Sequence, residues 1–225
     1  MRVLGLIPAR GGSRRVPRKN LARLGDKTLV RRAVETAVDA GCFGAVALSS
    51  EDPEILAEVE GTPALAVERP PELASDTSLA LDAVIHALDT VAGDWDAVAI
   101  IQATSPFTEP QDLRAAVELM EHTGAGSVVS VTRVEAREHP LKLKVLEGDR
   151  LRPWLEDDRM TPSHELPQLW VRNGSVYVTR TDILRSGEIV DPNDQRAFEM
   201  PPERSFDIDT PRDLAFAELL VSKGR

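Results

Sequence analysis

An arginine- and glycine-rich segment near the N-terminus has residue types suited to holding phosphate groups. Residues 7–20 read IPARGGSRRVPRKN and directly follow a short apolar run. Two adjacent glycines let backbone N–H groups approach phosphate oxygens closely, and the side chains of Arg10 and Lys19 can neutralise phosphate charge. A charge run alone is more typical of a solvated surface loop. The glycines and the position after a predicted strand favour an anion site.

Two well-known phosphate-binding patterns are absent from this sequence. Neither G-x-x-x-x-G-K-[ST] nor G-x-G-x-x-G occurs. The arginine-rich segment therefore does not match the loops of P-loop NTPases or of standard dinucleotide-binding proteins.

Two carboxylates lie close together in the sequence FDIDTP at residues 206–211. In an extended chain the side chains of Asp207 and Asp209 point to one face. Mg²⁺ commonly takes one or two carboxylates together with water and substrate phosphates. The plainer interpretation is that Asp209 or Thr210 caps the following helix. Together with the basic segment, the pair predicts a Mg²⁺ and triphosphate site, where charge on a transferring phosphoryl group is stabilised.

Weaker signals lie at two other predicted strand ends. The sequence QATSP at 102–106 follows a predicted strand, although serine and proline there usually mark only a turn. Arg172, Asn173 and Gly174 precede another strand, and Asn-Gly is more often a turn than a site.

The elements that must position these residues alternate between two periodicities. Strands are predicted at 3–7, 45–48, 64–67, 97–101 and 127–131, and a turn followed by a strand at 173–178. Helices are predicted at 28–40, 53–59, 77–90, 110–122 and 210–223. This alternation predicts a single α/β domain over 1–225 with a doubly wound, mostly parallel sheet. After residue 135 prolines interrupt the pattern, which predicts an inserted lobe at about 136–200 with a hairpin at 147–149.

The composition excludes several classes of function. The chain has 225 residues, of which 42% are hydrophobic, so one core can form without disulfides. A net charge of -10 and only 4% aromatic residues disfavour nucleic-acid and anionic-membrane binding. The single Cys42 forms no internal disulfide, the N-terminal apolar run is too short for a signal peptide, and no run could span a bilayer. We therefore expect a cytoplasmic protein.

Several blocks of the sequence occur in the order found in acylneuraminate cytidylyltransferases. They are residues 7–20, SSED at 49–52, RP at 69–70 with LASD at 73–76, QATSP at 102–106, Asn173-Gly174 and DIDT at 207–210. The chain thus resembles a CMP-sialic acid synthetase nearly from end to end, and the first block is the most specific.

The resemblance implies a Rossmann-like nucleotidyltransferase that moves CMP from CTP to a hydroxyl of an acidic sugar. It implies Mg²⁺ and a homodimer whose inserted lobe reaches the neighbouring active site. Nucleotide-binding positions by this resemblance are Ala9, Arg10, Gly11, Gly12, Ser13, Arg14, Lys19, Asn20 and Arg69. Substrate-binding positions are Gln102, Thr104, Ser105, Lys142, Asn173 and Tyr177, and metal-binding positions are Asp207 and Asp209. Catalytic roles fall to Arg10, Lys19 and Asp209, and either Asp209 or a metal-bound hydroxide is the candidate general base.

The sequence departs from the family pattern mainly at the sugar end. Ala103 stands in place of a proline, and Phe107-Thr108 stand in place of a leucine-arginine pair. An arginine usual before the Leu-Pro is replaced near Ser163-His164, although Arg159 could serve. A pocket that lacks a charged partner discriminates against the ligand that needs it. Legionaminic, pseudaminic and other ketoacid sugars and phosphonates therefore stay open as acceptors.

Two further functions stay open at this stage. The 3-deoxy-manno-octulosonate cytidylyltransferases share the chemistry but normally carry a different first loop and acceptor motif. A non-catalytic nucleotide-binding protein on the same fold is the other alternative, because a fold does not establish a function.

Overall fold

The computed structural model describes residues 1–13, 15–74, 80–155 and 161–224. These residues form a seven-stranded sheet in the order β11-β7-β10-β6-β1-β4-β5, in which β10 alone is antiparallel to its neighbours. The strands are β1 (Val3–Pro8), β4 (Ala45–Ser50), β5 (Leu65–Glu68), β6 (Ala97–Ile101), β7 (Ser127–Arg133), β10 (Trp170–Arg180) and β11 (Gln195–Glu199). The predicted α/β fold with a mostly parallel sheet is confirmed.

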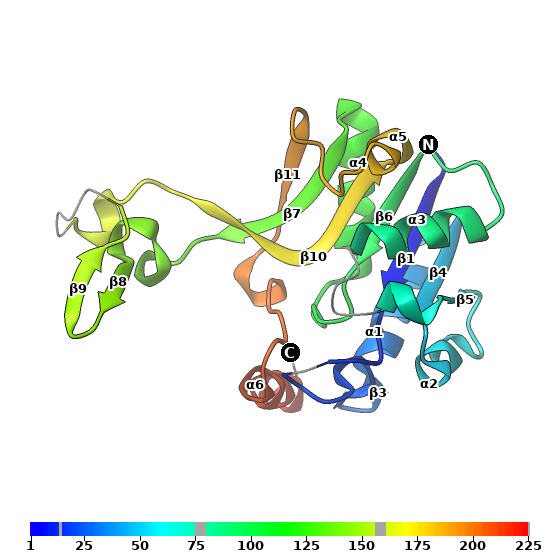
Figure 1. Ribbon diagram of the computed structural model, residues 1–225, viewed down its shortest axis with the longest axis horizontal. Coiled ribbons are helices and arrows are strands. Elements are labelled where there is room, and N and C mark those ends of the chain that lie inside the picture. The colour runs from blue at the N-terminus through cyan, green and yellow to red at the C-terminus, as the bar shows by residue number, and fades with distance from the viewer. Residues whose placement is uncertain (14, 75–79, 156–160, 225) are drawn as a thin grey trace.

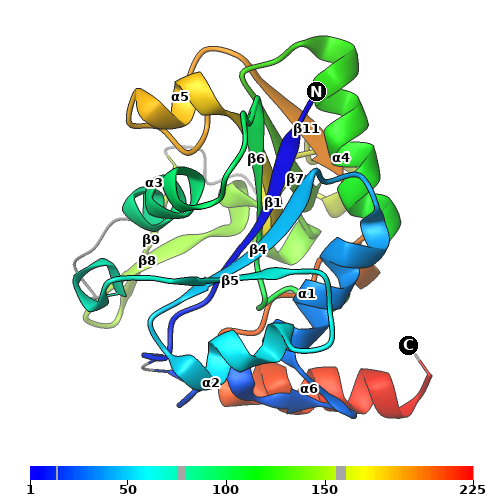
Figure 2. The ribbon, with the colours of Figure 1, turned by 90° about the vertical axis from the view of Figure 1, so that its right-hand side faces the viewer.

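Helices cover both faces of the sheet because the central strands are apolar on both sides (Figure 2). On one face α1 (Leu29–Ala40) and α4 (Pro110–Thr123) bury Val34 and Leu113 against β1 and β6. On the other face α3 (Ala80–Thr90) and α5 (Thr181–Arg185) bury Val84 and Leu184. This is the doubly wound arrangement.

A third apolar cluster lies beyond the carboxyl ends of the strands. It joins α6 (Pro211–Ser222) to the short strands β2 (Arg23–Leu24) and β3 (Lys27–Thr28) around the buried side chains of Leu24, Leu29 and Ile208. Thr210 caps α6 by accepting a hydrogen bond from the Asp213 N–H. The cluster fixes the segment that precedes α6 at this edge of the sheet.

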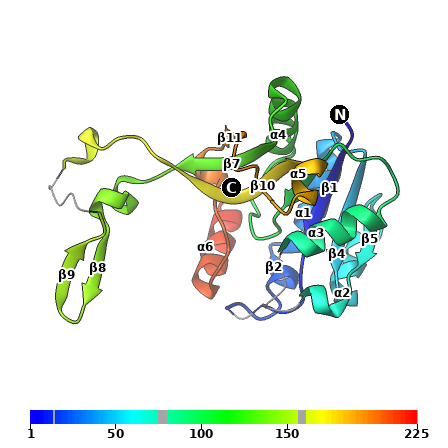
Figure 3. The ribbon, with the colours of Figure 1, turned by 45° about the horizontal axis from the view of Figure 1, so that its top comes forward.

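The arm, which we define as residues 134–155 and 161–169, extends away from the sheet between β7 and β10 (Figures 1 and 3). Its hairpin pairs β8 (Lys144–Glu147) with β9 (Arg150–Pro153) around the predicted turn. Residues 136–200, the range expected for an inserted lobe, divide between this arm and the strands β10 and β11 of the central sheet.

The remaining elements are short. They are α2 (Pro53–Leu56) and the 3-10 helices η1 (Lys19–Leu21), η2 (Ala57–Val59), η3 (Pro71–Ala74), η4 (Ala136–Glu138), η5 (Pro140–Lys142), η6 (Ser163–Glu165) and η7 (Pro202–Arg204). Within the described ranges, no helix has the length and apolarity needed to cross a bilayer.

One local prediction was wrong. Asn173-Gly174 was expected to form a turn before a strand, but both residues lie inside β10, which begins at Trp170. The pairing of β10 with β7 shifts register between Arg172 and Tyr177, and Gly174 has a φ of 79° there. The Asn-Gly pair thus marks an irregularity within a strand. The helix predicted from residue 77 begins at Ala80 in the described part of the chain, because 77–79 lie outside it.

Candidate active site

The predicted site residues gather where the strand order reverses direction. β1 lies between β4, the next strand of the sheet along the chain, and β6, which comes later. Such a switch point opens a crevice beyond the carboxyl ends of the strands, and ligands of open α/β sheets bind there. The loop after β1 and Gln102 after β6 both begin at this crevice.

The arginine loop, which we define as residues 9–13 and 15–18, is tied to neighbouring segments at its start. The Ala9 N–H donates to the Ser49 carbonyl at 2.9 Å, and Asn20 Nδ2 donates to the Arg10 carbonyl at 2.8 Å. Asn20 is buried, so this amide closes the base of the loop. Gly12 and Ser13 follow in the loop, and the predicted Arg14 lies outside the described residues.

Glu51 links the loop to a buried cation. One of its carboxylate oxygens accepts from the Gly11 N–H at 2.7 Å, and the other accepts from Arg69 Nη2 at 2.9 Å. Arg69 is 6% exposed and also lies 3.4 Å from the Ala9 carbonyl. The sequence analysis assigned no role to Glu51, although its position at the end of β4 places it at the same edge as the loop.

The close approach of Asp52 favours glycine at position 11, whereas no neighbouring atom requires glycine at position 12. A Cβ atom at Gly11 would lie 2.7 Å from Oδ2 of Asp52, which also caps α2 and pairs with Arg18 at 3.1 Å. A Cβ atom at Gly12 would meet no atom within 4 Å. Since the surroundings do not require Gly12, its lack of a side chain keeps the loop backbone accessible to a ligand.

Two cations of the loop region converge on one carboxylate of the Asp pair. Lys19 Nζ lies 3.1 Å from Asp209 Oδ1 and donates to the Ile208 carbonyl at 2.8 Å, while Arg15 Nη1 lies 3.1 Å from Asp209 Oδ2. The buried Ile208 anchors this extended segment between the two aspartates. The N-terminal basic segment and the C-terminal carboxylates therefore form one site.

Asp207 completes the carboxylate pair. Its side chain remains accessible to solvent, yet the surrounding protein displaces enough water to raise its pKa, and the charge of Asp209 raises that pKa further. A hydrogen bond with Thr104 and the charge of Lys19 oppose this rise. Two carboxylates that disfavour joint ionisation provide a suitable donor set for a divalent cation. Among the described residues, no cluster of three or more His, Cys, Asp and Glu side chains forms a fuller metal site.

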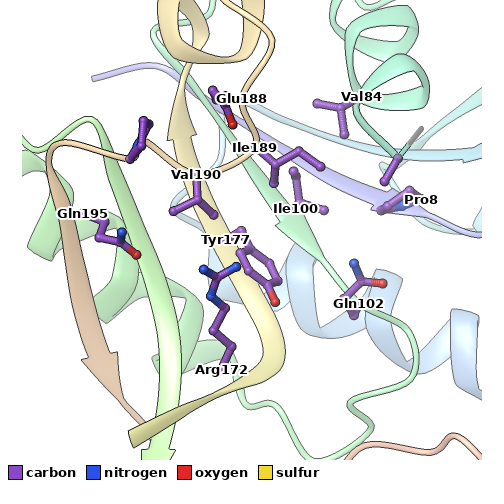
Figure 4. A pocket seen from close by; sticks show the side chains of 12 residues that line it. Pro8, Val84, Ile100, Gln102, Arg172, Tyr177, Glu188, Ile189, Val190 and Gln195 are labelled. Carbon is purple, nitrogen blue, oxygen red and sulfur yellow. The ribbon is translucent and has the colours of Figure 1, made fainter.

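A pocket of about 670 Å³ is lined by residues of β1, β6 and β10 (Figure 4). Its polar lining includes Gln102, Arg172, Tyr177, Glu188 and Gln195, and its apolar lining includes Pro8, Val84, Ile100, Ile189 and Val190. A second hollow of about 470 Å³ shares Arg172 and Tyr177 with the pocket and reaches Asp207. These two side chains therefore link the pocket to the carboxylate site.

The pKa of the Tyr177 phenol depends on burial and on charged groups that line the two hollows. Burial raises the pKa of its phenol; the nearby guanidinium of Arg172 opposes that rise, and the carboxylate of Asp207 adds to it. At neutral pH the phenol therefore stays protonated and can donate a hydrogen bond.

Asn173 and Ser105 are both buried, and Asn173 lines the hollow that reaches Asp207. Asn173 Nδ2 donates to Ser205 Oγ at 2.9 Å, and its Oδ1 accepts from the Ser175 N–H. The Ser105 N–H donates to the Gln102 carbonyl at 3.3 Å. These contacts support the shape of the site, since Ser205 leads directly into the Asp pair.

Lys142 lies apart from the other predicted residues. It ends η5 in the arm, where its Nζ donates to Ser163 Oγ at 2.9 Å. Within one chain the arm extends away from the crevice (Figure 1). Arg172 has no role predicted from the sequence, because its place in the pocket depends on the irregularity of β10.

Comparisons with known proteins show the family to which the chain belongs. The model of the cytidylyltransferase family matches residues 4–223. The chain is 31% identical to the CMP-N,N'-diacetyllegionaminic acid synthase of Legionella pneumophila, over 98% of this chain and 97% of that protein. It is 34% identical to N-acylneuraminate cytidylyltransferase A of Danio rerio, over 97% of this chain and 50% of the longer relative. A solved CMP:2-keto-3-deoxy-manno-octonic acid synthetase complexed with CTP shares the fold, with a TM-score of 0.76 and 20% identity over 100% of both chains.

Proposed function

Because the chain belongs to the cytidylyltransferase family, we propose that it transfers CMP from CTP to the anomeric hydroxyl of an acidic 2-keto sugar of the nonulosonic acid class. The hydroxyl oxygen attacks the α-phosphorus and forms a new P–O bond. The bond to the β-phosphate breaks, pyrophosphate leaves, and the proton of the hydroxyl passes to a general base, for which Asp209 is the candidate of this chain. The observation that carries the proposal is the meeting of Arg15 and Lys19 with Asp209, two residues from Asp207, which lines one hollow with Arg172 and Tyr177.

The arginine loop is the proposed triphosphate site. Backbone N–H groups near Gly12 and the side chains of Arg10, Ser13 and Lys19 would bind the phosphates, with Asn20 and Arg69 supporting the nucleotide. These donors are held in place before the ligand arrives, by Asn20 below the loop and by Glu51 beside it. Fixed cations near the leaving pyrophosphate stabilise the charge that develops as the bond breaks.

Asp207 and Asp209 are the proposed ligands of Mg²⁺. The two carboxylates and the phosphates of the nucleotide match the oxygen donors that this ion prefers. When bound, the ion supplies positive charge at the reacting phosphate. Lys19 and Arg15, which now pair with Asp209, would then be available to the triphosphate.

The pocket that Arg172 and Tyr177 line is the proposed acceptor site. Its mixture of a guanidinium, amides and apolar walls suits an acidic sugar with acyl or deoxy substituents better than a bare anion. The two curated relatives described above, named for legionaminic and acylneuraminic acids, support this class of acceptor. Positioning of the hydroxyl against the α-phosphate would supply much of the rate.

We also propose a homodimer assembled through the arm. Several large apolar side chains of the arm and its base are strongly exposed, among them Leu146, Leu151, Trp154 and Trp170. Such a patch is typical of a surface that another protein covers. A second copy would also explain why Lys142, a predicted acceptor contact, lies in the arm. We propose a cytoplasmic location, where CTP is available.

The decisive experiment measures pyrophosphate release by the purified protein with Mg²⁺ and each of the four nucleoside triphosphates. The acceptors are N-acetylneuraminic, N,N'-diacetyllegionaminic, pseudaminic and 3-deoxy-manno-octulosonic acids and a phosphonate. We expect release with CTP and one nonulosonic acid. Preference for 3-deoxy-manno-octulosonic acid or for the phosphonate would replace the proposed acceptor. Absence of release across the panel, despite measurable CTP binding, would contradict the transferase function.

A further inference from the structure

The pocket contains the guanidinium of Arg172, to which neither the family pattern nor the other site residues assign a role. Ser163-His164 stand where the family pattern has an arginine, and Arg159, the candidate substitute, lies outside the described residues. Arg172, from the first half of β10, lines both the pocket and the hollow that reaches Asp207. Figure 4 shows its side chain beside Tyr177 and directed toward Val190.

The irregularity of β10 brings Arg172 and Tyr177 into the same pocket. The two residues are five positions apart, and in a regular strand an odd separation places side chains on opposite faces. Arg172 is paired with Val131 and Tyr177 with Val129, so five steps along β10 match only two along β7. The extra residues around Gly174 redirect the strand, as irregularities of this kind do near active sites.

Arg172 differs from two other arginines of the sheet, both of which pair with a carboxylate. Arg133 on β7 lies 2.7 Å from Glu199, and Arg180 at the end of β10 lies 3.1 Å from Asp182. Within the described part of the chain, Arg172 has no carboxylate partner. The chain carries 37 acidic and 27 basic side chains, so the lack of a carboxylate beside Arg172 does not reflect a shortage of acidic residues. The guanidinium remains available to an anion that enters the pocket.

We propose that Arg172 binds the carboxylate of the acidic acceptor and thereby determines that the enzyme selects acids. The inference rests on the proposed function and names the residue of this chain that recognises the charge of the acceptor. A guanidinium can hold a carboxylate by two parallel hydrogen bonds. Gln102 and the Tyr177 phenol lie in the same lining as further polar contacts, and Val84, Ile189 and Val190 form an apolar wall for the rest of the sugar.

The test compares an acid with its uncharged analogue. Pyrophosphate release is measured with the best acid of the panel and with its C1 methyl ester, for the wild-type protein and for Arg172→Gln, Arg172→Lys and Arg180→Gln. For Arg172→Gln we expect kcat/KM for the acid to fall on the order of 100-fold, while the ester changes little and the Kd of CTP is unchanged. The acid-to-ester ratio then approaches unity.

The variants and controls separate charge from geometry and from folding. Arg172→Lys keeps the charge without the planar fork, so we expect an intermediate ratio. Arg180→Gln removes the same group from the other end of the same strand and should retain the wild-type ratio. Thermal unfolding of each variant checks that the fold is intact. A wild-type ratio in Arg172→Gln would overturn the inference while leaving the proposed function standing.

A second measurement decides the inference if the wild-type protein turns over none of the acids. That result contradicts the proposed function, and titration calorimetry with N-acetylneuraminic acid then tests Arg172 alone. Binding to the wild-type protein at least ten times tighter than to Arg172→Gln supports the inference. Equal binding, or no binding to either protein, overturns it.

Discussion

The arginine loop and the arm are supported very differently by their own chain. The loop is tied to Asn20 just beyond its end and to Glu51 and the buried Arg69, which follow β4 and β5. The arm extends away from the sheet and carries a hairpin whose Leu146 and Leu151 are 67% and 69% exposed. The proposed homodimer predicts this difference: the nucleotide site forms within one chain, and the acceptor side draws on a second copy.

The carboxylate pair should give the largest effect, because both halves of the site depend on it. We expect Asp209→Asn to lower kcat by on the order of 100- to 1000-fold, while CTP binding measured by calorimetry changes only a few-fold. Asp39→Asn, an exposed carboxylate at the end of α1, is the matched control. Turnover that survives Asp209→Asn would remove the metal assignment.

Charges placed on the arm should impair its two proposed roles, in dimerisation and in acceptor turnover. They should not affect the nucleotide binding proposed for the loop. Leu146 and Leu151 are directly paired across the hairpin, and we expect the double variant Leu146→Asp, Leu151→Asp to weaken dimerisation on the order of 100-fold or more. Light scattering would report the change of mass. Acceptor turnover should fall with it, while the Kd of CTP stays as in the wild-type protein.

A charge substitution elsewhere in the hairpin is the control for this experiment. Arg150→Asp also adds an acid to the exposed hairpin but removes no apolar contact, so the dimer should persist. A monomeric wild-type protein with full turnover would contradict the contrast between loop and arm.

Glu51 should contribute to stability as well as to nucleotide binding. We expect Glu51→Gln to lower the free energy of unfolding by about 2 kcal/mol, because the buried Arg69 loses its charged partner. The Kd of CTP should rise as the loop loosens. Glu54→Gln breaks the exposed pair with Arg18 and should change stability by less than about 0.5 kcal/mol. Equal effects of the two variants in urea unfolding would show that Glu51 is not special.

The two glycines of the loop should respond in opposite ways, with the smallest effects of the series. Gly11→Ala forces Asp52 to shift, and we expect a loss of stability of about 1 kcal/mol. Gly12→Ala should leave stability unchanged but weaken CTP binding several-fold, since the new methyl group projects into open space beside the loop. Wild-type CTP affinity in Gly12→Ala would remove the argument for ligand approach at that position.

The sequence predicts those features of the fold and site that depend on local patterns. The apolar runs of β1 and β6 and the amphipathic spacing of α1 are local, and so is the alternation that turns Ile208 inward between two aspartates. The convergence of Lys19 on Asp209 depends on topology, but the order of the strands makes it predictable.

Other features depend on contacts that no local pattern encodes. Glu51 acquires its role only when the ends of β4 and β5 meet the loop. Arg172 reaches the pocket because the register of β10 shifts, and a strict two-residue alternation predicts the opposite face. Lys142 belongs to the arm, which extends away from the crevice of its own chain, so only the proposed second copy could bring it to an acceptor.

The central position of β10 has a consequence for how the chain is made. This strand lies between β6 and β7, yet it is synthesised some 37 residues after β7 ends, because the arm intervenes. Until it emerges from the ribosome, β6 presents an unpaired edge and β7 has no partner strand, because β11 is synthesised later still. Such a late closing strand leaves apolar edges open during synthesis, when chains aggregate most readily. The yield of folded protein should therefore depend on how quickly residues 170–180 join β7 to the rest of the sheet.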